Sequence, residues 1–311
     1  MSGIITRLSR EPDSPALRFI WRTVFGKADE DLFFGFDFSD SLCIIAEHDH
    51  IPAGAGYLLP AGNLLYGGAS VPCAMIYGVA VLPEHRNHGI GINVVNELIK
   101  AGWEAGYTAI VTCPSEDSLF RYYNAHAGFN DWFYTTEEIY TKVPDTVGQS
   151  RITESPPGEY AQLRERLLEV TPHIEVTPGF LDYQKVLSRE YGGGLFRIDT
   201  LYGVCCAIVE RQPDSSVWVK ELLYPDTTEN AWSESDFAAD KDLTVTANAK
   251  TAVLSALASV IPSSRTIVRS PVHHSTNKAL IRRFGMLTAQ ANLCGSDSAE
   301  TALPWYGPAF D

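Results

Sequence analysis

The residues best suited to chemistry in this chain lie in one short turn. Arg86, Gly89 and Gly91 form an Arg-x-x-Gly-x-Gly pattern, which follows an apolar run at residues 79–82 and precedes a helical pattern. Such a turn aims successive backbone N–H groups at one point, and the helix N-terminus adds partial positive charge there. The glycines leave room for an anion to approach closely, and Arg86 can add charge-assisted hydrogen bonds. The turn therefore predicts a phosphate or pyrophosphate site.

The segments around this turn narrow the choice of ligand. Residues 92–103 have apolar side chains at helical spacing, residues 108–113 resemble a strand, and residues 118–123 begin a second short helix that ends near Gly128 and Phe129. The dinucleotide fingerprint and the P-loop pattern are both absent. Across residues 42–133, the order of these elements resembles the acetyl-CoA-binding region of the GCN5-related N-acetyltransferase (GNAT) superfamily.

This resemblance implies acetyl-CoA as co-substrate and assigns its contacts. Val79 and Val81 are expected to hydrogen-bond the pantetheine arm through their backbones, where the strand splays from its neighbour. A backbone N–H at Val81 would polarise the thioester carbonyl as negative charge builds on its oxygen. The pyrophosphate would lie on the turn, at Arg86, Asn87, His88, Gly89, Ile90, Gly91 and Ile92.

The resemblance also implies a general acid that protonates the departing CoA thiolate. Tyr123 is the closest match in this sequence, with Tyr122 beside it. The family's tyrosine stands four residues before the glycine that ends the helix. Here Tyr123 stands five residues before Gly128, and Asn124 occupies the usual position. Because one helical step is about 100°, only one of the two adjacent tyrosines can face the cofactor.

The rest of the chain suggests a second copy of the same fold. Its 311 residues favour two domains, and residues 144–158 have the Pro, Gly, Ser and Thr content of a linker. We expect a catalytic domain at 1–145 and a degenerate domain with a C-terminal tail at 158–311. The second half should contain helices at 159–170, 181–191 and 252–261, a hairpin at 195–211, strands at 217–225 and 265–270, and a short helix at 276–286. Its acidic segment at 226–242 contains no Arg-x-x-Gly-x-Gly and should be a solvated loop that binds no phosphate.

The predicted fold class is therefore α/β in layered form, with tandem GNAT folds, each a mixed central sheet flanked by helices. One active and one degenerate copy resemble bacterial acetyltransferases of the enhanced-intracellular-survival type. That type uses cationic amine acceptors, so the resemblance implies an acceptor of this class. In the first half, residues 29–38 are either a hydrophobic cap or a wall of the acceptor pocket. One hypothesis is that residues 303–311 fold back toward the first half, so that the terminal carboxylate acts in the acceptor site; the sequence does not decide whether this segment reaches that site.

Composition limits the class of protein further. The net charge of −14 argues against nucleic-acid binding and suits a cationic substrate. No apolar run is long enough to cross a bilayer, and the first residues are too polar for a signal peptide, so we expect a cytoplasmic protein. The six cysteines show no C-x-x-C spacing, so we expect core residues and no metal site. The sequence leaves open whether the chain forms a homo-oligomer.

The function predicted from these features is N-acetyl transfer from acetyl-CoA to a primary amine by direct attack on the thioester. Two alternatives stay open. A non-catalytic acyl-CoA sensor would use the same pocket without turnover. A transferase for another acyl group would admit a propionyl, succinyl or longer chain at the splay of the strand, and the sequence does not define the depth of that channel. The sequence does not identify the general base.

Overall fold

The computed structural model describes residues 3–38, 40–142, 150–225, 238–272, 277–290 and 303–310, with side chains from residue 248 onward in the fourth of these ranges. The first half contains β1 (Ile4–Leu8), α1 (Ser14–Phe25), α2 (Lys27–Gly35), β2 (Leu42–His48), β3 (Ile51–Tyr66), β4 (Ala69–Val81), α3 (Ile90–Glu104), β5 (Ala109–Thr112), α4 (Asp117–Ala127) and β6 (Asn130–Tyr140). The second half contains β7 (Arg151–Glu154), α5 (Pro157–Leu167), β8 (His173–Val176), α6 (Pro178–Glu190), β9 (Gly194–Thr200), β10 (Gly203–Arg211), β11 (Val217–Leu223), α7 (Ala238–Val260), β12 (Thr266–Ser270) and β13 (Ile281–Ala289). Short 3-10 turns, η1 (Glu11–Asp13), η2 (Pro83–His85) and η4 (Lys278–Leu280), join some of them.

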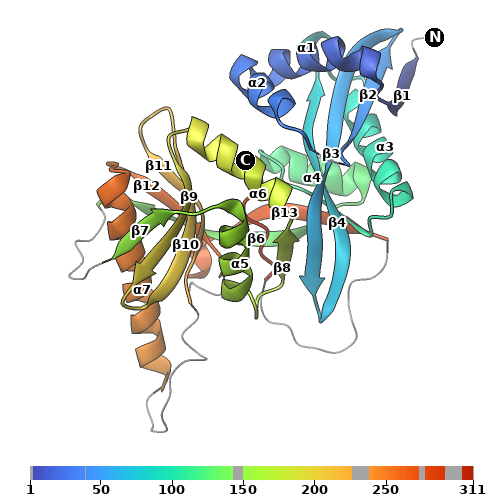
Figure 1. Cartoon of the computed structure of the whole chain (residues 1–311). Helices are drawn as coiled ribbons and strands as arrows, with labels where there is room; N and C mark the ends of the chain where they lie inside the picture. The colour runs from blue at the N-terminus through green and yellow to red at the C-terminus, as the bar shows by residue number, and fades with distance from the viewer. Residues whose placement is uncertain are drawn as a thin grey trace.

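The strands of the described residues form one continuous mixed sheet that runs through both halves (Figure 1). Its order is β1-β2-β3-β4-β5-β13-β6-β12-β11-β10-β9-β7, and β8 pairs with β3. In the first half β3 and β4 are antiparallel and β5 follows in parallel. In the second half β10 and β11 are antiparallel and β12 follows in parallel. The two halves thus repeat one strand arrangement, as the tandem-fold prediction requires.

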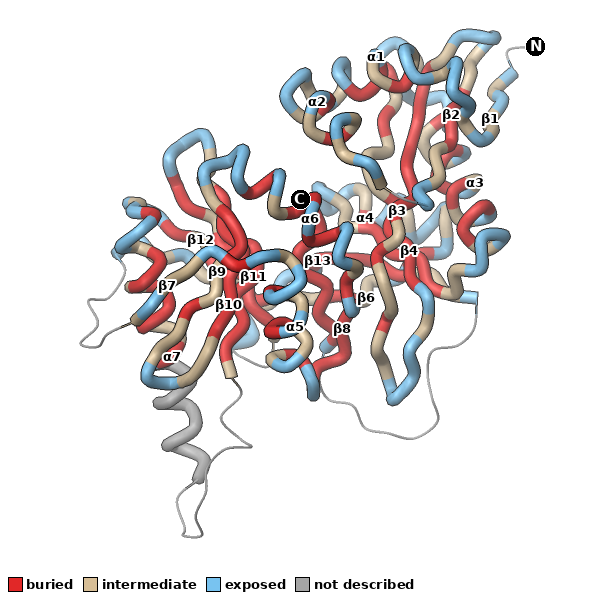
Figure 2. The backbone as a smooth tube through the Cα atoms, in the orientation of Figure 1, coloured by how far each residue is buried: buried red, intermediate tan, exposed pale blue. Residues whose placement is uncertain are grey.

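Helices cover both faces of this sheet. Ile44 packs against α3 and Ile45 packs against α1, because successive side chains of a strand point to opposite faces. The same alternation in β10 turns Cys205 toward α7 and Cys206 toward α5 and α6. The buried stretches shown in red in Figure 2 accordingly follow the strands and the inner sides of the helices. The expected class, a mixed sheet flanked by helices, is confirmed.

Two local predictions were wrong. The expected short helix at 276–286 is a 3-10 turn followed by β13, which lies between β5 and β6. The expected loop over 226–242 gives way to α7 at Ala238, and residues 226–237 lie outside the described part of the chain. Because β13 pairs with two strands of the first half, the division into domains at 1–145 and 158–311 stays a prediction.

Candidate active site

The Arg-x-x-Gly-x-Gly turn connects β4 to α3, as the sequence predicted. After Pro83 a 3-10 turn reverses the chain, and Asn87 and Gly89 then take left-handed backbone conformations with φ of 65° and 79°. Gly89 is the N-cap of α3, and a Cβ atom built on it meets no atom within 4 Å. Residues 86–89 are exposed. The first N–H groups of a helix lack partners within it, so an anion can reach the amides at this turn.

Arg86 lies at the start of this turn and bends back toward the strand. Its Nε donates a hydrogen bond to the Val81 carbonyl oxygen at 3.3 Å. The rest of the guanidinium remains at an exposed position on the loop. The guanidinium therefore lies at the mouth of the turn, where it can contribute donors to a bound phosphate.

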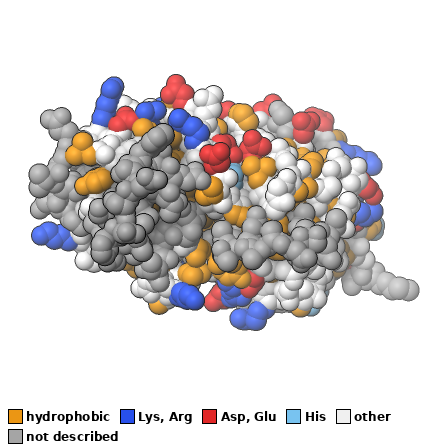
Figure 3. Space-filling view, turned by 90° about the horizontal axis from the view of Figure 1, so that it is seen from below, with side chains coloured by type: hydrophobic (Ala, Val, Ile, Leu, Met, Phe, Trp, Pro, Cys, Tyr) orange, Lys and Arg blue, Asp and Glu red, His pale blue; other side chains and the backbone are white. Residues whose placement is uncertain are grey.

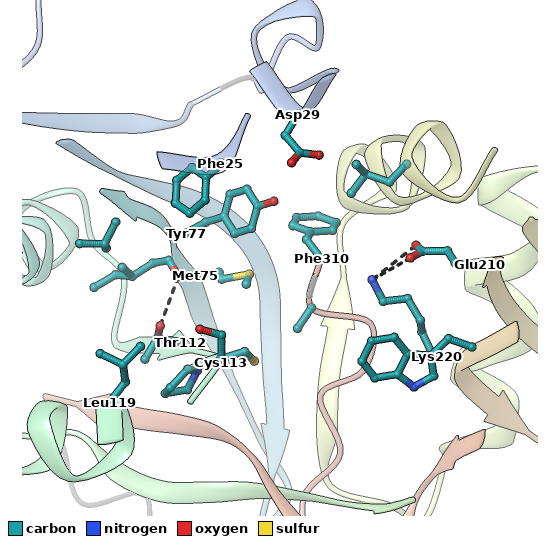
Figure 4. A pocket seen from close by; sticks show the side chains of 18 of the residues that line it. Phe25, Asp29, Met75, Tyr77, Thr112, Cys113, Leu119, Glu210, Lys220 and Phe310 are labelled. Atoms are coloured by element: carbon teal, nitrogen blue, oxygen red, sulfur yellow. Dashed lines mark hydrogen bonds and ion pairs between the residues drawn. The ribbon is translucent and has the colours of Figure 1, made fainter. Parts of the chain in front are cut away.

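The strands β4 and β5 separate below this turn. Their parallel pairing ends at Met75 and Val111. Beyond that point the Thr112 side chain bridges them, by donating from Oγ1 to the Ile76 carbonyl at 3.4 Å (Figure 4). A bulge at Gly78, with φ of 60°, bends β4 further, and a Cβ there would lie 2.4 Å from Trp21. The β4–β5 ladder therefore does not extend to Val79 and Val81, in agreement with the splay that the family resemblance implies.

A cavity of about 540 Å³ opens from this separation toward the second half. This volume is in the range of small-molecule sites. One wall of the cavity is formed by β4, the end of β5 and α4. The opposite wall is formed by the end of α6 and by β10 and β11. Residues of α1, α2 and the C-terminal segment line the space between these walls. Figure 4 shows this arrangement, with Met75 and Thr112 facing Lys220 across the space that Phe310 borders.

The structure separates the two candidate tyrosines. Tyr123 lines the cavity, and burial raises the pKa of its phenol to about 12. Tyr122 is exposed and packs against His126, with 4.6 Å between ring centroids. Asn124, at the usual position of the family tyrosine, donates from Nδ2 to the Phe129 carbonyl at 2.8 Å and so ties down the helix end.

The remaining predicted site residues divide between the cavity and the turn. Val79 lines the cavity. Val81 lies higher on β4, where it pairs with Gly54. The residues of the turn itself, 86–92, do not line the cavity and are connected to it by β4. In the segment at 29–38, Asp29 lines the cavity, while Phe33 stacks on Trp21 with 4.1 Å between ring centroids, as a hydrophobic cap would.

The C-terminal segment lies between the two halves (Figure 1). Phe310 lines the cavity and contacts the Tyr77 ring at 5.5 Å between centroids. A buried ionic cluster holds this segment: Arg164 donates to the Gly307 carbonyl at 2.8 Å, and Trp305 donates to Glu221 at 2.7 Å. The expected return of this segment toward the first half is thus confirmed, whereas Asp311 lies outside the described residues.

Sequence reasoning missed the charged pair on the opposite wall. Lys220 of β11 and Glu210 of β10 are both buried and line the cavity, with Nζ and Oε2 3.2 Å apart. A signal existed, because Lys220 and Glu221 interrupt an apolar strand run and Glu210 ends another. Buried charges in such a run are rarely retained without a partner or a ligand.

On the face shown in Figure 3, acidic and basic side chains lie close together among hydrophobic ones. Within the described ranges no group of three or more His, Cys, Asp or Glu side chains is suited to a metal ion. None of the described helices has the length and apolar character needed to cross a membrane.

Comparison with solved structures identifies acetyltransferases that have a similar fold. A GCN5-related N-acetyltransferase from Anabaena variabilis superposes with a TM-score of 0.64 at 14% identity, over 92% of this chain and 73% of that one. Eis1 from Mycobacterium abscessus gives 0.57 at 14% identity, over 92% and 73%. A tandem GNAT protein from the clavulanic acid biosynthesis pathway gives 0.53 at 11% identity, over 95% and 100%. At these identities the likeness shows the fold, including its tandem form.

Comparison of sequences finds a family match in the first half of the chain. A search of curated proteins gives no match. Residues 13–129 match the model of the acetyltransferase (GNAT) family, and this range contains the turn, the separated strands and the helix of Tyr123. Residues 13–129 are therefore similar to the acetyltransferase domain of the GNAT family, and the whole chain shares its fold with GCN5-related N-acetyltransferases.

Proposed function

We propose that this chain transfers the acetyl group of acetyl-CoA to a primary amine, by direct attack of the amine on the thioester. The observation that carries this proposal is the separation of β4 from β5. It opens a cavity beside β4 past its last β5 pair at Met75, where β4 still pairs with β3, and the Arg-x-x-Gly-x-Gly turn follows the end of the same strand. An extended ligand with a pyrophosphate and a thioester suits that arrangement.

The turn, the edge of β4 and the cavity each suit one part of acetyl-CoA. The open space over Gly89 and the left-handed conformation at Asn87 would accept the pyrophosphate, together with Arg86, His88, Ile90, Gly91 and Ile92. The unpaired edge of β4 at Val79 and Val81 would hydrogen-bond the pantetheine amides. This placement would put the thioester next to the cavity that holds the Tyr123 phenol.

The reaction needs a neutral amine, a polarised carbonyl and a proton for the leaving thiolate. Free alkylamines have a pKa near ~10, so the acceptor must lose a proton before attack. Backbone N–H groups of β4 near Val81 would stabilise the negative charge that develops on the carbonyl oxygen. Tyr123 would then donate its proton to the CoA sulfur as the carbon–sulfur bond breaks.

An amine acceptor agrees with the charge of the cavity and the chain. Asp29 is a half-buried carboxylate on the cavity wall, and Tyr191 holds it by donating to Oδ1 at 2.8 Å. With the net charge of −14, this carboxylate would draw an alkylammonium toward the cavity mouth. We propose a cationic amine as the acceptor for this reason.

Replacing Gly89 by tryptophan tests the proposal, because the side chain would cover the amides of the turn. Loss of one charge-assisted hydrogen bond costs ~1.5–3 kcal/mol, so acetyl-CoA should bind at least ~10-fold more weakly. Calorimetric titration measures this change. Gly106→Trp is the matched control, since Gly106 ends the same helix region with φ of 92° and equally open surroundings. Equal affinity of the Gly89 variant and the wild type would contradict the placement.

Turnover distinguishes an enzyme from a sensor. A panel of primary amines is incubated with acetyl-CoA, and released thiol is measured. We expect thiol release that depends on the amine. Binding of acetyl-CoA without release, across the whole panel, would support the sensor instead. Substitution of propionyl-CoA or succinyl-CoA in the same assay tests the alternative of another acyl group.

A further inference from the structure

Three histidine rings from two segments of the first half meet at the Arg-x-x-Gly-x-Gly turn. His48 ends β2, His85 ends η2, and His88 lies in the turn itself. The Nδ1 atoms of His48 and His85 lie 3.0 Å apart, and 4.8 Å separates the ring centroids of His48 and His88. His48 and His85 are half-buried, and His88 is exposed. We call these three residues the histidine cluster. Neither His48 nor His85 is among the residues that the sequence assigned to the pyrophosphate.

The contact between His48 and His85 fixes how many protons the pair can hold. A hydrogen bond between two Nδ1 atoms requires a proton on one of them and a lone pair on the other. When both rings are neutral, the donor ring has an unprotonated Nε2, which can accept one proton from solvent. That proton makes the bond charge-assisted and leaves it intact. A second proton would have to occupy the accepting Nδ1 and would break the bond. The pair is thus a site for one positive charge.

Among the described residues, no carboxylate forms an ion pair with the histidine cluster. The other acidic, basic and imidazole side chains of β1, of β2 and of the loops at 49–50 and 83–89 are Arg7, Glu47, Asp49, His50, Glu84 and Arg86. Glu47 pairs with Arg7 at 2.8 Å, and Asp49 accepts from the Gly3 N–H at 3.2 Å. Residues 51–56 of β3 and the first turn of α3 add no charge. An anionic ligand on the turn would therefore supply a partner for the protonated pair that these residues do not.

We propose that the histidine cluster is a phosphate subsite for acetyl-CoA, in which the His48–His85 pair takes up one proton from solvent as acetyl-CoA binds. Negative charge on the turn favours the imidazolium form of a nearby histidine. His88, which belongs to the turn and contacts His48, would bring the cluster to the phosphates. The inference rests on the proposed function, because it requires acetyl-CoA on the turn. It adds His48 and His85 to the acetyl-CoA site and makes the affinity for acetyl-CoA depend on pH.

The direction of this pH dependence follows from proton uptake. Histidine changes charge between about pH 5 and pH 8, so lower pH in this range favours the protonated pair and tighter binding. The phosphate monoester of CoA itself titrates near about pH 6, so the measure is the ratio of affinities between the wild type and a variant. In His48→Asn with His85→Asn, each amide lies where imidazole Nδ1 lay and stays neutral. We expect the wild type to bind ~10-fold more tightly near about pH 6, and the ratio should fall toward 1 above about pH 8.

Calorimetry of acetyl-CoA binding measures the proton directly. Titrations near about pH 7, where histidine titrates, are run in PIPES and in imidazole, two buffers with different enthalpies of ionisation. The difference in observed enthalpy gives the number of protons taken up. We expect net uptake by the wild type and loss of that uptake in the double variant. His126→Asn is the matched control, because His126 is an exposed histidine of α4 whose Nδ1 contacts the Tyr122 carbonyl at 2.9 Å. This control should keep the uptake of the wild type.

The outcomes separate the inference from the proposed function. Binding of acetyl-CoA without proton uptake, or uptake that the double variant retains, overturns the inference and leaves acetyl transfer standing. If the double variant does not fold, nitrogen-15 NMR of the wild type decides. Acetyl-CoA should move the ring nitrogens of His48 and His85 toward the imidazolium position, and unchanged resonances overturn the inference. Failure of the wild type to bind acetyl-CoA overturns the proposed function and the inference together.

Discussion

Replacing Tyr123 by phenylalanine is expected to lower kcat for acetyl transfer by about 10²–10⁴-fold, the contribution of a general acid. The substitution keeps the ring that lines the cavity and removes only the phenolic proton. Steady-state kinetics with acetyl-CoA and an amine that supports turnover measure the change. The KM for acetyl-CoA should change little, because the role assigned to the phenol is protonation of the leaving sulfur.

Tyr122→Phe is the matched control, because Tyr122 lies on the same helix but is exposed and packs against His126. Its kcat should stay within about 2-fold, as for a surface substitution away from the site. A loss below a few-fold in the Tyr123 variant would remove that residue from the mechanism. A large loss in the Tyr122 variant would show that the wrong tyrosine was assigned.

The pH dependence of the same reaction follows from the pKa of Tyr123. Burial disfavours the phenolate and raises this pKa to about 12, so the phenol keeps its proton throughout the range from pH 6 to pH 9. The ratio of kcat between the wild type and Tyr123→Phe should therefore be constant between pH 6 and pH 9. A ratio that falls tenfold per pH unit within this range would contradict a protonated phenol in the wild type.

Replacing Arg164 by methionine is expected to destabilise the chain by about 3–5 kcal/mol, the cost of leaving a buried charge without its partner. Arg164 and Glu221 are both fully buried, and their side chains lie 3.1 Å apart. Burial raises the pKa of Glu221, and hydrogen bonds from Trp305, Tyr160 and Arg164 oppose that rise. Without the guanidinium, Glu221 must either take up a proton or stay charged in an apolar site. Urea denaturation measures the free energy of unfolding.

Two variants show whether the effect belongs to the buried charge. Arg164→Met with Glu221→Gln leaves no buried charge and keeps a side chain for the donors of Tyr160 and Trp305, so it should be more stable than Arg164→Met alone. Arg197→Met removes an exposed arginine that pairs with Asp199 and should cost below about 1 kcal/mol. Equal losses for Arg164→Met and Arg197→Met would refute the account of the cluster.

The region of the turn could be predicted from sequence because its signals are local. Pro83 ends the strand, Gly89 takes the left-handed conformation that starts α3, and the apolar spacing of α3 follows at once. Each of these features depends on residues within one or two turns of chain. The separation of β4 from β5 came from the family resemblance, and the structure supplies its physical basis in the bulge at Gly78.

The pairing of distant segments could not be predicted in this way. Residues 276–286 imitate the helix end at Gly128 through their own Gly285, yet β13 forms there because β5 and β6 each offer an unpaired edge. Those edges lie far away in sequence, 155 residues for the pairing of Met286 with Asp131 of β6 and 174 residues for its pairing with Thr112 of β5. The Lys220–Glu210 pair was missed for the same reason, since only the fold brings β10 and β11 to the cavity.

The central claim is that acetyl-CoA lies along β4, with its pyrophosphate on the turn and its thioester at the cavity. A crystal structure of the chain with acetyl-CoA tests it most directly. We expect phosphate oxygens within hydrogen-bond distance of the backbone N–H groups at Gly89 and Gly91, and the acetyl group between β4 and β5 near Tyr123. Acetyl-CoA bound at another surface, or no acetyl-CoA bound at saturating concentration, would contradict the claim.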